Sequence, residues 1–594
     1  MEKVNTANTG ANFLFTKLDP ETLFTPEEFT DEHILIGRTA KQFTEKMVHP
    51  EKDRIENQEF ELVTDLLRKA GELGLLAHSI PEKYGGLGLD KISKGIVGEN
   101  IASSGGYGVA HSNHTCIATL PITYFGTPEQ KEKYLPKLAS GEYIGAYCLT
   151  EPNAGSDALS SQTTAVLNED GTHYILNGTK IYITNAVFSD TFIVYAKVDG
   201  RHFTAFIVER DTPGLSLGPE ENKMGIKGSS TRSVIFEDCP VPAENLLGEV
   251  GKGHIIALNV LNLGRFNLGS ACMGAAKTGL KKTLQFTGER KQFGKSIADF
   301  PATKEKTAKM AGRIYAAESL QYRTASLLEE SLGDLYESTD VKLIGKRMSE
   351  YATECAICKV FGSETLDYTA DESLQLHGGA GFIKEYGVEQ MYRDSRINRI
   401  FEGTNEINRL LIPTHLFRKA LKGEIDLAAR VEEAIVRLSK PAPIGEAIFE
   451  KERAAVDTIR NLFMLNAGLA YEAFGDTLVH EQEALMKLAD LAIALYAAET
   501  AVYRTYKAIQ KNGEEKEELK IQLTRTFLEG AIWEAERLSR QLVSELSSDE
   551  KKDALIGLII RECSRFSSFG KENARNRRIA ELIYEKGEYC CLKI

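Results

Sequence analysis

The chain has few of the residues that mark secreted, metal-binding or membrane-spanning proteins. Its 594 residues include nine cysteines, too few for the dense disulfide frameworks of small secreted domains. The one Cys-x-x-Cys pair, Cys355 and Cys358, lies in a helical pattern without a second pair, so no metal or redox site is predicted. No apolar run is as long as a membrane-spanning helix requires.

Targeting signals and a basic surface are also missing. The N-terminus has neither the apolar core of a signal peptide nor the Arg-rich helix of a transit peptide. We therefore expect a reduced, cytoplasmic compartment. The formal net charge of -13 argues against nucleic acid as the main ligand.

The common nucleotide-binding and catalytic fingerprints are absent as well. The stretch "LHGGAGFIKEYG" follows no strand and lacks the spacing of a dinucleotide-binding turn. The stretch "GEVGKGH" lacks the first glycine and the Ser or Thr of a P-loop, and neither HExxH nor GxSxG occurs. Any cofactor site must therefore be built in another way.

The patterning predicts a mainly α protein with a central antiparallel β domain. Helical periodicity changes near residue 143 to β-branched and aromatic segments separated by "EDG", "NG" and "VDG" turns. It returns near residue 254 in one long helix that runs through "RKQFG". We expect an extended arm at 1–30, a helical domain at 31–142, a β domain at 143–250, a helical bundle at 251–424, a proline-marked linker at 425–448 and a further helical domain at 449–594.

Two polar, glycine-containing stretches are candidates for a site. In "AYCLTEPNAGSDALS", Thr150 and Ser156 offer hydroxyls beside a flexible turn, although an ordinary loop capped by Asp157 would have the same composition. In "RIFEGTNEINR", Glu402 directly precedes Gly403. The alternative for Glu402 is an exposed acid beside a helix start, where the helix dipole favours negative charge.

Four motifs in order resemble the acyl-CoA dehydrogenase family of flavoproteins. They are "CLTEPNAGSD", "RKQFGK", "QLHGGAGFIKEY" followed by Arg393 and Asp394, and "IFEGTNEI". The resemblance covers about residues 30 to 415. The additional C-terminal helical unit makes the chain most similar to the very-long-chain subgroup.

The resemblance implies FAD-dependent α,β-dehydrogenation of an acyl-CoA to trans-2-enoyl-CoA in fatty acid β-oxidation, with electrons passing to an electron-transfer flavoprotein. Glu402 matches the base that removes the α-proton, and burial beside the acyl chain and flavin should raise its pKa. Some relatives place the base before a substrate-binding arginine. Here that arginine is Arg265, and Gly264 before it has no side chain.

The resemblance also implies the remaining site residues. Several cofactor contacts come from the neighbouring subunit in the family, so we expect a homodimer or a dimer of dimers. The implied substrate contacts are Ser156, Asn262, Arg265 and Gly403. The implied cofactor contacts are Tyr147, Leu149, Thr150, Ser156, Tyr182, Thr184, Arg290, Phe293, Gln375, Gly378, Gly379, Thr404 and Glu406.

Some alternatives stay open at this stage. An acyl-CoA oxidase would use the same base and flavin but pass electrons to oxygen, and a non-catalytic relative could act as a scaffold. The amphipathic, partly basic stretch at 415–440 could make a peripheral membrane contact. Long acyl chains are favoured, but chain length depends on cavity depth, which the sequence does not state.

Overall fold

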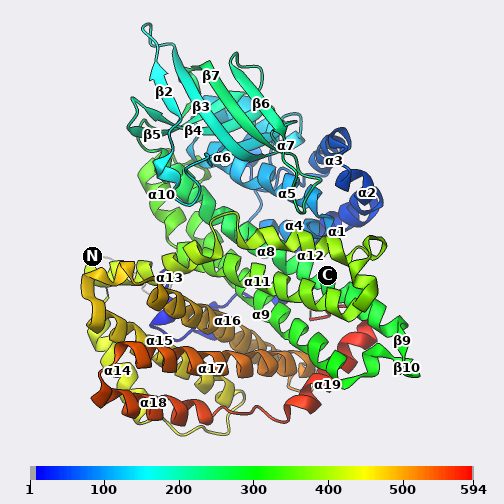
Figure 1. Ribbon diagram of the computed structural model, residues 1–594, viewed down its shortest axis with the longest axis vertical. Helices are drawn as coiled ribbons and strands as arrows, with labels where there is room; N and C mark the ends of the chain where they lie inside the picture. The colour runs from blue at the N-terminus through cyan, green and yellow to red at the C-terminus, as the bar shows by residue number, and fades with distance from the viewer. Residues whose placement is uncertain (1–8, 424, 592–594) are drawn as a thin grey trace.

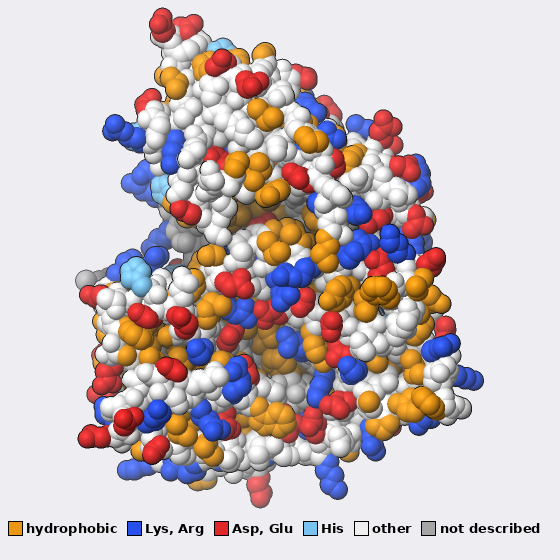
Figure 2. All heavy atoms as spheres, viewed as in Figure 1, with side chains coloured by type: hydrophobic (Ala, Val, Ile, Leu, Met, Phe, Trp, Pro, Cys, Tyr) orange, Lys and Arg blue, Asp and Glu red, His pale blue; other side chains and the backbone are white. Residues whose placement is uncertain are grey.

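A computed structural model describes residues 9–423 and 425–591 of the chain. A β domain lies at one end, a long-helix layer spans the middle, and the last helices form a bundle at the opposite end (Figure 1). No helix among the described residues is long and apolar enough to cross a membrane. On the face in Figure 2, acidic and basic side chains are interspersed over the helical half.

The N-terminal segment is not the extended arm that its composition predicts. Residues 1–8 lie outside the described part, and the rest up to residue 28 forms three short 3-10 helices, η2 (Asn12–Leu14), η3 (Pro20–Thr22) and η4 (Pro26–Glu28). Phe13 is buried, and its carbonyl oxygen accepts a hydrogen bond from Nε of Arg460 at 3.1 Å. The segment therefore packs against the C-terminal bundle.

The first helical domain owes its helix starts to side-chain caps. Oγ1 of Thr30 accepts from the backbone N–H of His33, and Oδ1 of Asp90 accepts from that of Ser93 at 2.7 Å. A π-helical turn, η9 (His114–Ala118), interrupts the helices beside the cavity described below. The helices are α1 (Asp31–Phe43), α2 (Lys52–Glu56), α3 (Phe60–Glu72), α4 (Lys91–Ile101), α5 (Gly106–Asn113), α6 (Leu120–Phe125) and α7 (Pro128–Ser140).

The middle domain is one twisted sheet in the order β6-β7-β3-β2-β4-β5-β8, with β1 paired to β4. Most pairs are antiparallel, as predicted, but β1–β4 and β2–β4 are parallel, which the sequence pattern did not indicate. The strands are β1 (Gly145–Cys148), β2 (Thr164–Leu167), β3 (His173–Thr184), β4 (Thr191–Val198), β5 (His202–Glu209), β6 (Leu215–Glu220), β7 (Thr231–Pro242) and β8 (Leu246–Leu247).

The long-helix layer packs closely because glycines meet at its centre. A Cβ atom on Gly362 would lie 3.0 Å from the α-carbon of Gly269. The long first helix ends earlier than predicted, and "RKQFG" forms a hairpin of β9 (Lys291–Gln292) and β10 (Lys295–Ser296). The helices are α8 (Gly253–Glu289), α9 (Pro301–Leu332), α10 (Val341–Ser349), α11 (Ala352–His377), α12 (Val388–Ser395) and α13 (Asn405–Leu421).

The stretch expected as a linker at 425–448 contains a helix, α14 (Leu427–Ser439). Its buried side chains are Leu427, Ala434 and Leu438, and α14 packs against α15. These apolar side chains therefore belong to the protein interior. The bundle continues with α15 (Glu450–Phe474), α16 (Gln482–Asn512), α17 (Glu518–Leu546), α18 (Asp549–Ser564) and α19 (Glu572–Lys586).

Buried charges join the bundle to the rest of the chain. Arg504 on α16 is buried, and its guanidinium donates to Oε2 of Glu318 on α9 at 2.7 Å and to Oε1 of Glu27 at 2.9 Å. Burial favours the neutral form of Glu27, but Arg504 and Lys520 outweigh it and lower the pKa of this carboxyl to about 2. The N-terminal segment, α9 and α16 are therefore held together by one ionic cluster.

Candidate active site

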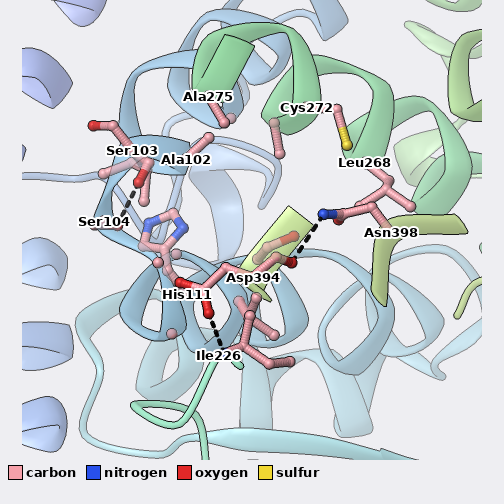
Figure 3. Close-up of a pocket in the computed structure, with 18 of the residues that line it drawn as sticks. Ala102, Ser103, Ser104, His111, Ile226, Leu268, Cys272, Ala275, Asp394 and Asn398 are labelled. Atoms are coloured by element: carbon pink, nitrogen blue, oxygen red, sulfur yellow. Dashed lines mark hydrogen bonds between the residues drawn. The ribbon is translucent and has the colours of Figure 1, made fainter. Parts of the chain in front are cut away.

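A cavity of about 480 Å³ lies where the first helical domain, the β domain and α8 meet. Its wall includes Cys116 from the π-turn, Thr184 at the end of β3, Gly264 on α8 and Glu402. Figure 3 shows His111, Asp394 and the α8 side chains Leu268, Cys272 and Ala275 arranged around this space. The volume is typical of a site for a small molecule or part of a larger one.

Glu402 lies in the short loop between η16 (Arg396–Arg399) and α13, and its backbone is left-handed with φ 58°. Such a conformation is uncommon for a residue other than glycine and places the side chain toward the cavity rather than along the following helix. Atom Oε2 of Glu402 is buried and has no hydrogen-bond partner among the described residues. Leaving a buried carboxylate oxygen without a partner costs free energy, so this atom is available to a ligand that enters the cavity.

Burial raises the pKa of Glu402 to about 7, although Arg265 and Lys359 oppose the shift. The cavity thus holds a carboxyl whose proton affinity matches that of a general base working near neutral pH. The predicted direction of the shift agrees with the structure.

Three side chains clamp the loop that carries Glu402. Nε of Arg265 donates to the carbonyl oxygen of Glu402 at 3.3 Å, and Nζ of Lys359 donates to that of Gly403 at 2.8 Å. Nδ2 of Asn408 also donates to the Gly403 carbonyl oxygen, at 2.8 Å. Sequence reasoning missed Lys359 and Asn408. The sequence signal that could have indicated Lys359 is its place as the single lysine in the apolar run "CAICKVFG".

Arg265 and Asn262, the two α8 residues implied to contact substrate, are hydrogen-bonded to each other. Its Nη1 donates to Oδ1 of Asn262 at 2.9 Å, and its Nε binds the backbone of Glu402. The guanidinium is buried, and burial lowers its pKa while Glu402 raises it. Arg265 therefore positions the loop, and a direct contact of Arg265 with substrate stays a prediction.

Thr404 and Glu406 do not line the cavity. Oγ1 of Thr404 accepts from the backbone N–H of Ile407 at 3.2 Å and so caps α13. Glu406 is exposed on the first turn of that helix. Their predicted cofactor contacts are not part of the cavity wall.

Some of the β-domain residues predicted to contact the cofactor are buried, and others are exposed to solvent. Tyr147 and Leu149 are buried, and the hydroxyl of Tyr147 donates to the carbonyl oxygen of Ala257 at 3.5 Å. Tyr182 is 63% exposed with φ 58°, so its ring is free to stack against a ligand. Thr150 and the exposed Ser156 lie in the loop after β1.

A second group of predicted cofactor residues lies far away, at the C-terminal ends of α8 and α11. From Gly264 to Arg290 the α8 axis rises about 39 Å at about 1.5 Å per residue. Phe293 is 93% exposed, and a Cβ on Gly378 or Gly379 would meet nothing within 4 Å. This second group is therefore not part of the cavity wall that contains Glu402.

The motif pair Arg393 and Asp394 ties the β domain to the helical layer. Oδ1 of Asp394 accepts from the backbone N–H of Ile226 at 2.5 Å, and Nη1 of Arg393 donates to the carbonyl oxygen of Met224 at 2.8 Å (Figure 3 shows the first contact). Burial raises the pKa of Asp394 to about 6. The pair therefore fixes one wall of the cavity.

Comparisons with known proteins cover nearly the whole chain. Models of the acyl-CoA dehydrogenase N-terminal, middle and C-terminal domains match residues 30–142, 146–239 and 251–417, and a further acyl-CoA dehydrogenase C-terminal domain model matches 458–560.

Similar full-length proteins have the same architecture. A probable acyl-CoA dehydrogenase of Bacillus subtilis is 47% identical over 99% of both chains. The mitochondrial very long-chain specific acyl-CoA dehydrogenase of Bos taurus is 36% identical over 80% of this chain and 74% of that one. A crystal structure of an acyl-CoA dehydrogenase complexed with FAD from Bacillus anthracis has a TM-score of 0.95 and 46% identity, covering 98% of this chain and 99% of that one.

Proposed function

Because the chain belongs to the acyl-CoA dehydrogenase family of FAD-dependent enzymes, we propose that Glu402 removes the α-proton of a long-chain acyl-CoA to give the trans-2-enoyl-CoA. The observation that carries this proposal is the buried, unpartnered Oε2 of Glu402 in the cavity wall. The function of this carboxylate is to accept a proton from a carbon acid that water would not deprotonate.

The chain's own groups favour proton transfer in three ways. The Arg265 and Lys359 contacts fix the Glu402 loop before substrate arrives, so little reorganisation is needed. A pKa near 7 leaves Glu402 a much stronger base than an exposed glutamate. Glycine at position 264 leaves room for the Glu402 carboxylate itself, because a Cβ atom there would lie 2.6 Å from its Oε2.

When bound, FAD supplies the acceptor for the hydride that leaves the β-carbon. Thr184 and the open ring of Tyr182 would hold the flavin end beside the cavity. The distant group around Phe293 and Gly378 would hold the other end of a cofactor bound mainly to a second subunit. We therefore propose at least a homodimer, in a cytoplasmic setting.

Long acyl chains are supported by the extent of the cavity and by the kind of relative that shares the C-terminal unit. The wall continues from Gly264 along α8 to Lys282, well beyond the base. The very long-chain specific relative matches 80% of this chain. We propose an electron-transfer flavoprotein as the electron acceptor.

Anaerobic titration of the yellow holoenzyme tests this function. Hexadecanoyl-CoA should bleach the flavin rapidly and butanoyl-CoA poorly, because the longer chain fills the cavity along α8. Glu402→Gln should keep FAD but lose bleaching, whereas the exposed Glu432→Gln on α14 should behave as the wild type. Normal bleaching by Glu402→Gln would contradict the assignment of the base.

The electron acceptor needs a separate measurement. Turnover should require electron-transfer flavoprotein and should release little peroxide in air. Peroxide formed at the rate of turnover would instead identify an acyl-CoA oxidase.

A further inference from the structure

The cavity that contains Glu402 follows one face of α8 to a distant opening. The helix contributes wall residues at every turn, so the cavity is an elongated channel beside the helix. These residues are Gly264, Asn267, Leu268, Ala271, Cys272, Ala275, Thr278 and Lys282.

The length of this channel sets the scale of a chain that would fill it. Eighteen helical steps from Gly264 to Lys282 correspond to about 27 Å. An extended hydrocarbon advances about 1.25 Å per carbon, given a C–C bond of about 1.5 Å and a near-tetrahedral angle. A chain of about 20 carbons would therefore reach from the base to the level of Lys282.

Two lysines and a histidine surround the far end of the channel. His49, Lys52 and Lys282 all line it, and both lysines are exposed where it meets solvent. Nε2 of His49 lies 3.2 Å from Oγ of Ser103, which also lines the channel. We call His49, Lys52, Lys282 and Ser103 the basic rim.

The lysines of the basic rim have no carboxylate to neutralise them. No ion pair of Lys52 or Lys282 occurs within residues 9–423 and 425–591, whereas the adjacent Lys281 is paired with Glu588 at 2.9 Å. The protein packed around the Lys282 side chain and the charge of Lys52 both lower the pKa of Lys282, although the residue is exposed to solvent. Burial and both lysines likewise lower the pKa of His49, whereas the contact with the Ser103 carbonyl oxygen and the charge of Glu45 raise it.

Other acids near the channel are already engaged. Asp394 accepts the backbone N–H of Ile226, and Oε1 of Glu56 accepts from Arg393 at 3.3 Å. The basic rim is therefore a positively charged opening at the end of a channel that leads to a catalytic carboxylate. A methyl end of a fatty acyl chain would gain nothing from such an opening, whereas an anionic end would be attracted to it.

We propose that the basic rim binds the terminal carboxylate of ω-carboxyacyl-CoA substrates, the CoA monothioesters of long dicarboxylic acids. This inference rests on the proposed function, because it requires the thioester end to lie at Glu402. The rim discriminates by charge between two chains of the same length. Exposed lysines are screened by salt, so the preference is moderate and declines as ionic strength rises.

Binding and turnover should be compared for icosanoyl-CoA and for the CoA monothioester of icosanedioic acid, whose chains have the length that reaches Lys282. The holoenzyme carrying Glu402→Gln allows calorimetric binding of both ligands without turnover. Replacing Lys52 and Lys282 together by glutamine should weaken the carboxylate-ended ligand about tenfold, as two partly screened ion pairs imply. Binding of icosanoyl-CoA should change less than twofold. The kcat/KM values of the double variant with Glu402 intact should follow the same pattern.

Two controls distinguish a specific effect of the basic rim from a general loss of positive charge and from a loss of bound FAD. Lys281→Gln, one residue away but paired with Glu588, should leave the preference unchanged. The FAD content of the double variant should equal that of the wild type. If the double variant loses FAD, the rim belongs to the cofactor site and the proposal is wrong.

The remaining outcomes are equally decisive. Equal weakening of both ligands, or no effect on either, would overturn the proposal for the rim. If carboxylate-selective binding persists while neither thioester is oxidised by the wild type, the rim is supported and the proposed reaction is wrong instead.

Discussion

Gly264 faces Glu402 so closely that a Cβ atom at position 264 would lie 2.6 Å from the buried Oε2 of Glu402. The base on the loop and a side chain on this turn of α8 therefore cannot occupy the same space. The hydrogen atom at position 264 is what allows the carboxylate to face the cavity. A side chain added at position 264 should therefore displace the Glu402 carboxylate.

Gly264→Ala should lower kcat/KM by about 100-fold, because a displacement of about 1 Å is enough to cost that much in a positioned catalytic group. Folding should not suffer, since alanine is about 1 kcal/mol more favourable than glycine within a helix. Gly288→Ala on the same helix, where a Cβ meets nothing within 4 Å, is the matched control. Unchanged kcat/KM in Gly264→Ala would show that Glu402 acts from another position.

The pH dependence of kcat/KM should have an acidic limb near 7. Glu402 acts only when deprotonated, and burial raises its pKa to about 7, so activity falls as pH decreases through that value. Steady-state kinetics from pH 5.5 to 8.5 measure the limb. If kcat/KM stays level down to pH 5.5, as a glutamate with the exposed pKa of about 4.3 would give, the carboxyl is solvated in the working enzyme.

Lys359 is predicted to be a positioning residue. Lys359→Met removes the donors to the Gly403 carbonyl oxygen and to Oδ1 of Asn405, at 2.8 and 2.7 Å, and removes a positive charge that lowers the pKa of Glu402. The acidic limb should therefore move to higher pH, and kcat should fall about tenfold. Lys359→Arg should restore the limb, and the exposed Lys342→Met on α10 should not move it. A lower kcat with an unmoved limb would indicate a merely structural role.

Arg504→Met should destabilise the fold by about 3 kcal/mol, because it removes the cation that Glu27 and Glu318 share and leaves them only Lys520 and Lys277. Urea unfolding followed by the fluorescence of Trp533, the only tryptophan and a residue of α17, measures the change. Arg578→Met, which breaks an exposed pair with Glu518, should leave the transition nearly unchanged. Equal effects of the two substitutions would show that the buried cluster adds no stability beyond a surface pair.

Local patterning predicted the helix–sheet–helix–helix order because periodicity and turn residues act over short distances. It could not predict the N-terminal contacts, since Glu27 meets Arg504 only through a separation of 477 residues. The same limit explains why 425–448 was taken as a linker. The prolines there do interrupt the helical pattern. However, α14, which is capped by Asp426, is stabilised by packing on α15.

The sequence by itself determined the family motifs, the presence of a glutamate before a glycine and a helix cap, and the lack of a side chain at position 264. Only the tertiary structure decided that Glu402 and Gly264 face each other, that Lys359 clamps the loop, and that the channel ends at Lys52 and Lys282. The reason is that a raised pKa and an elongated cavity arise from elements that are distant in the chain and become neighbours only on folding.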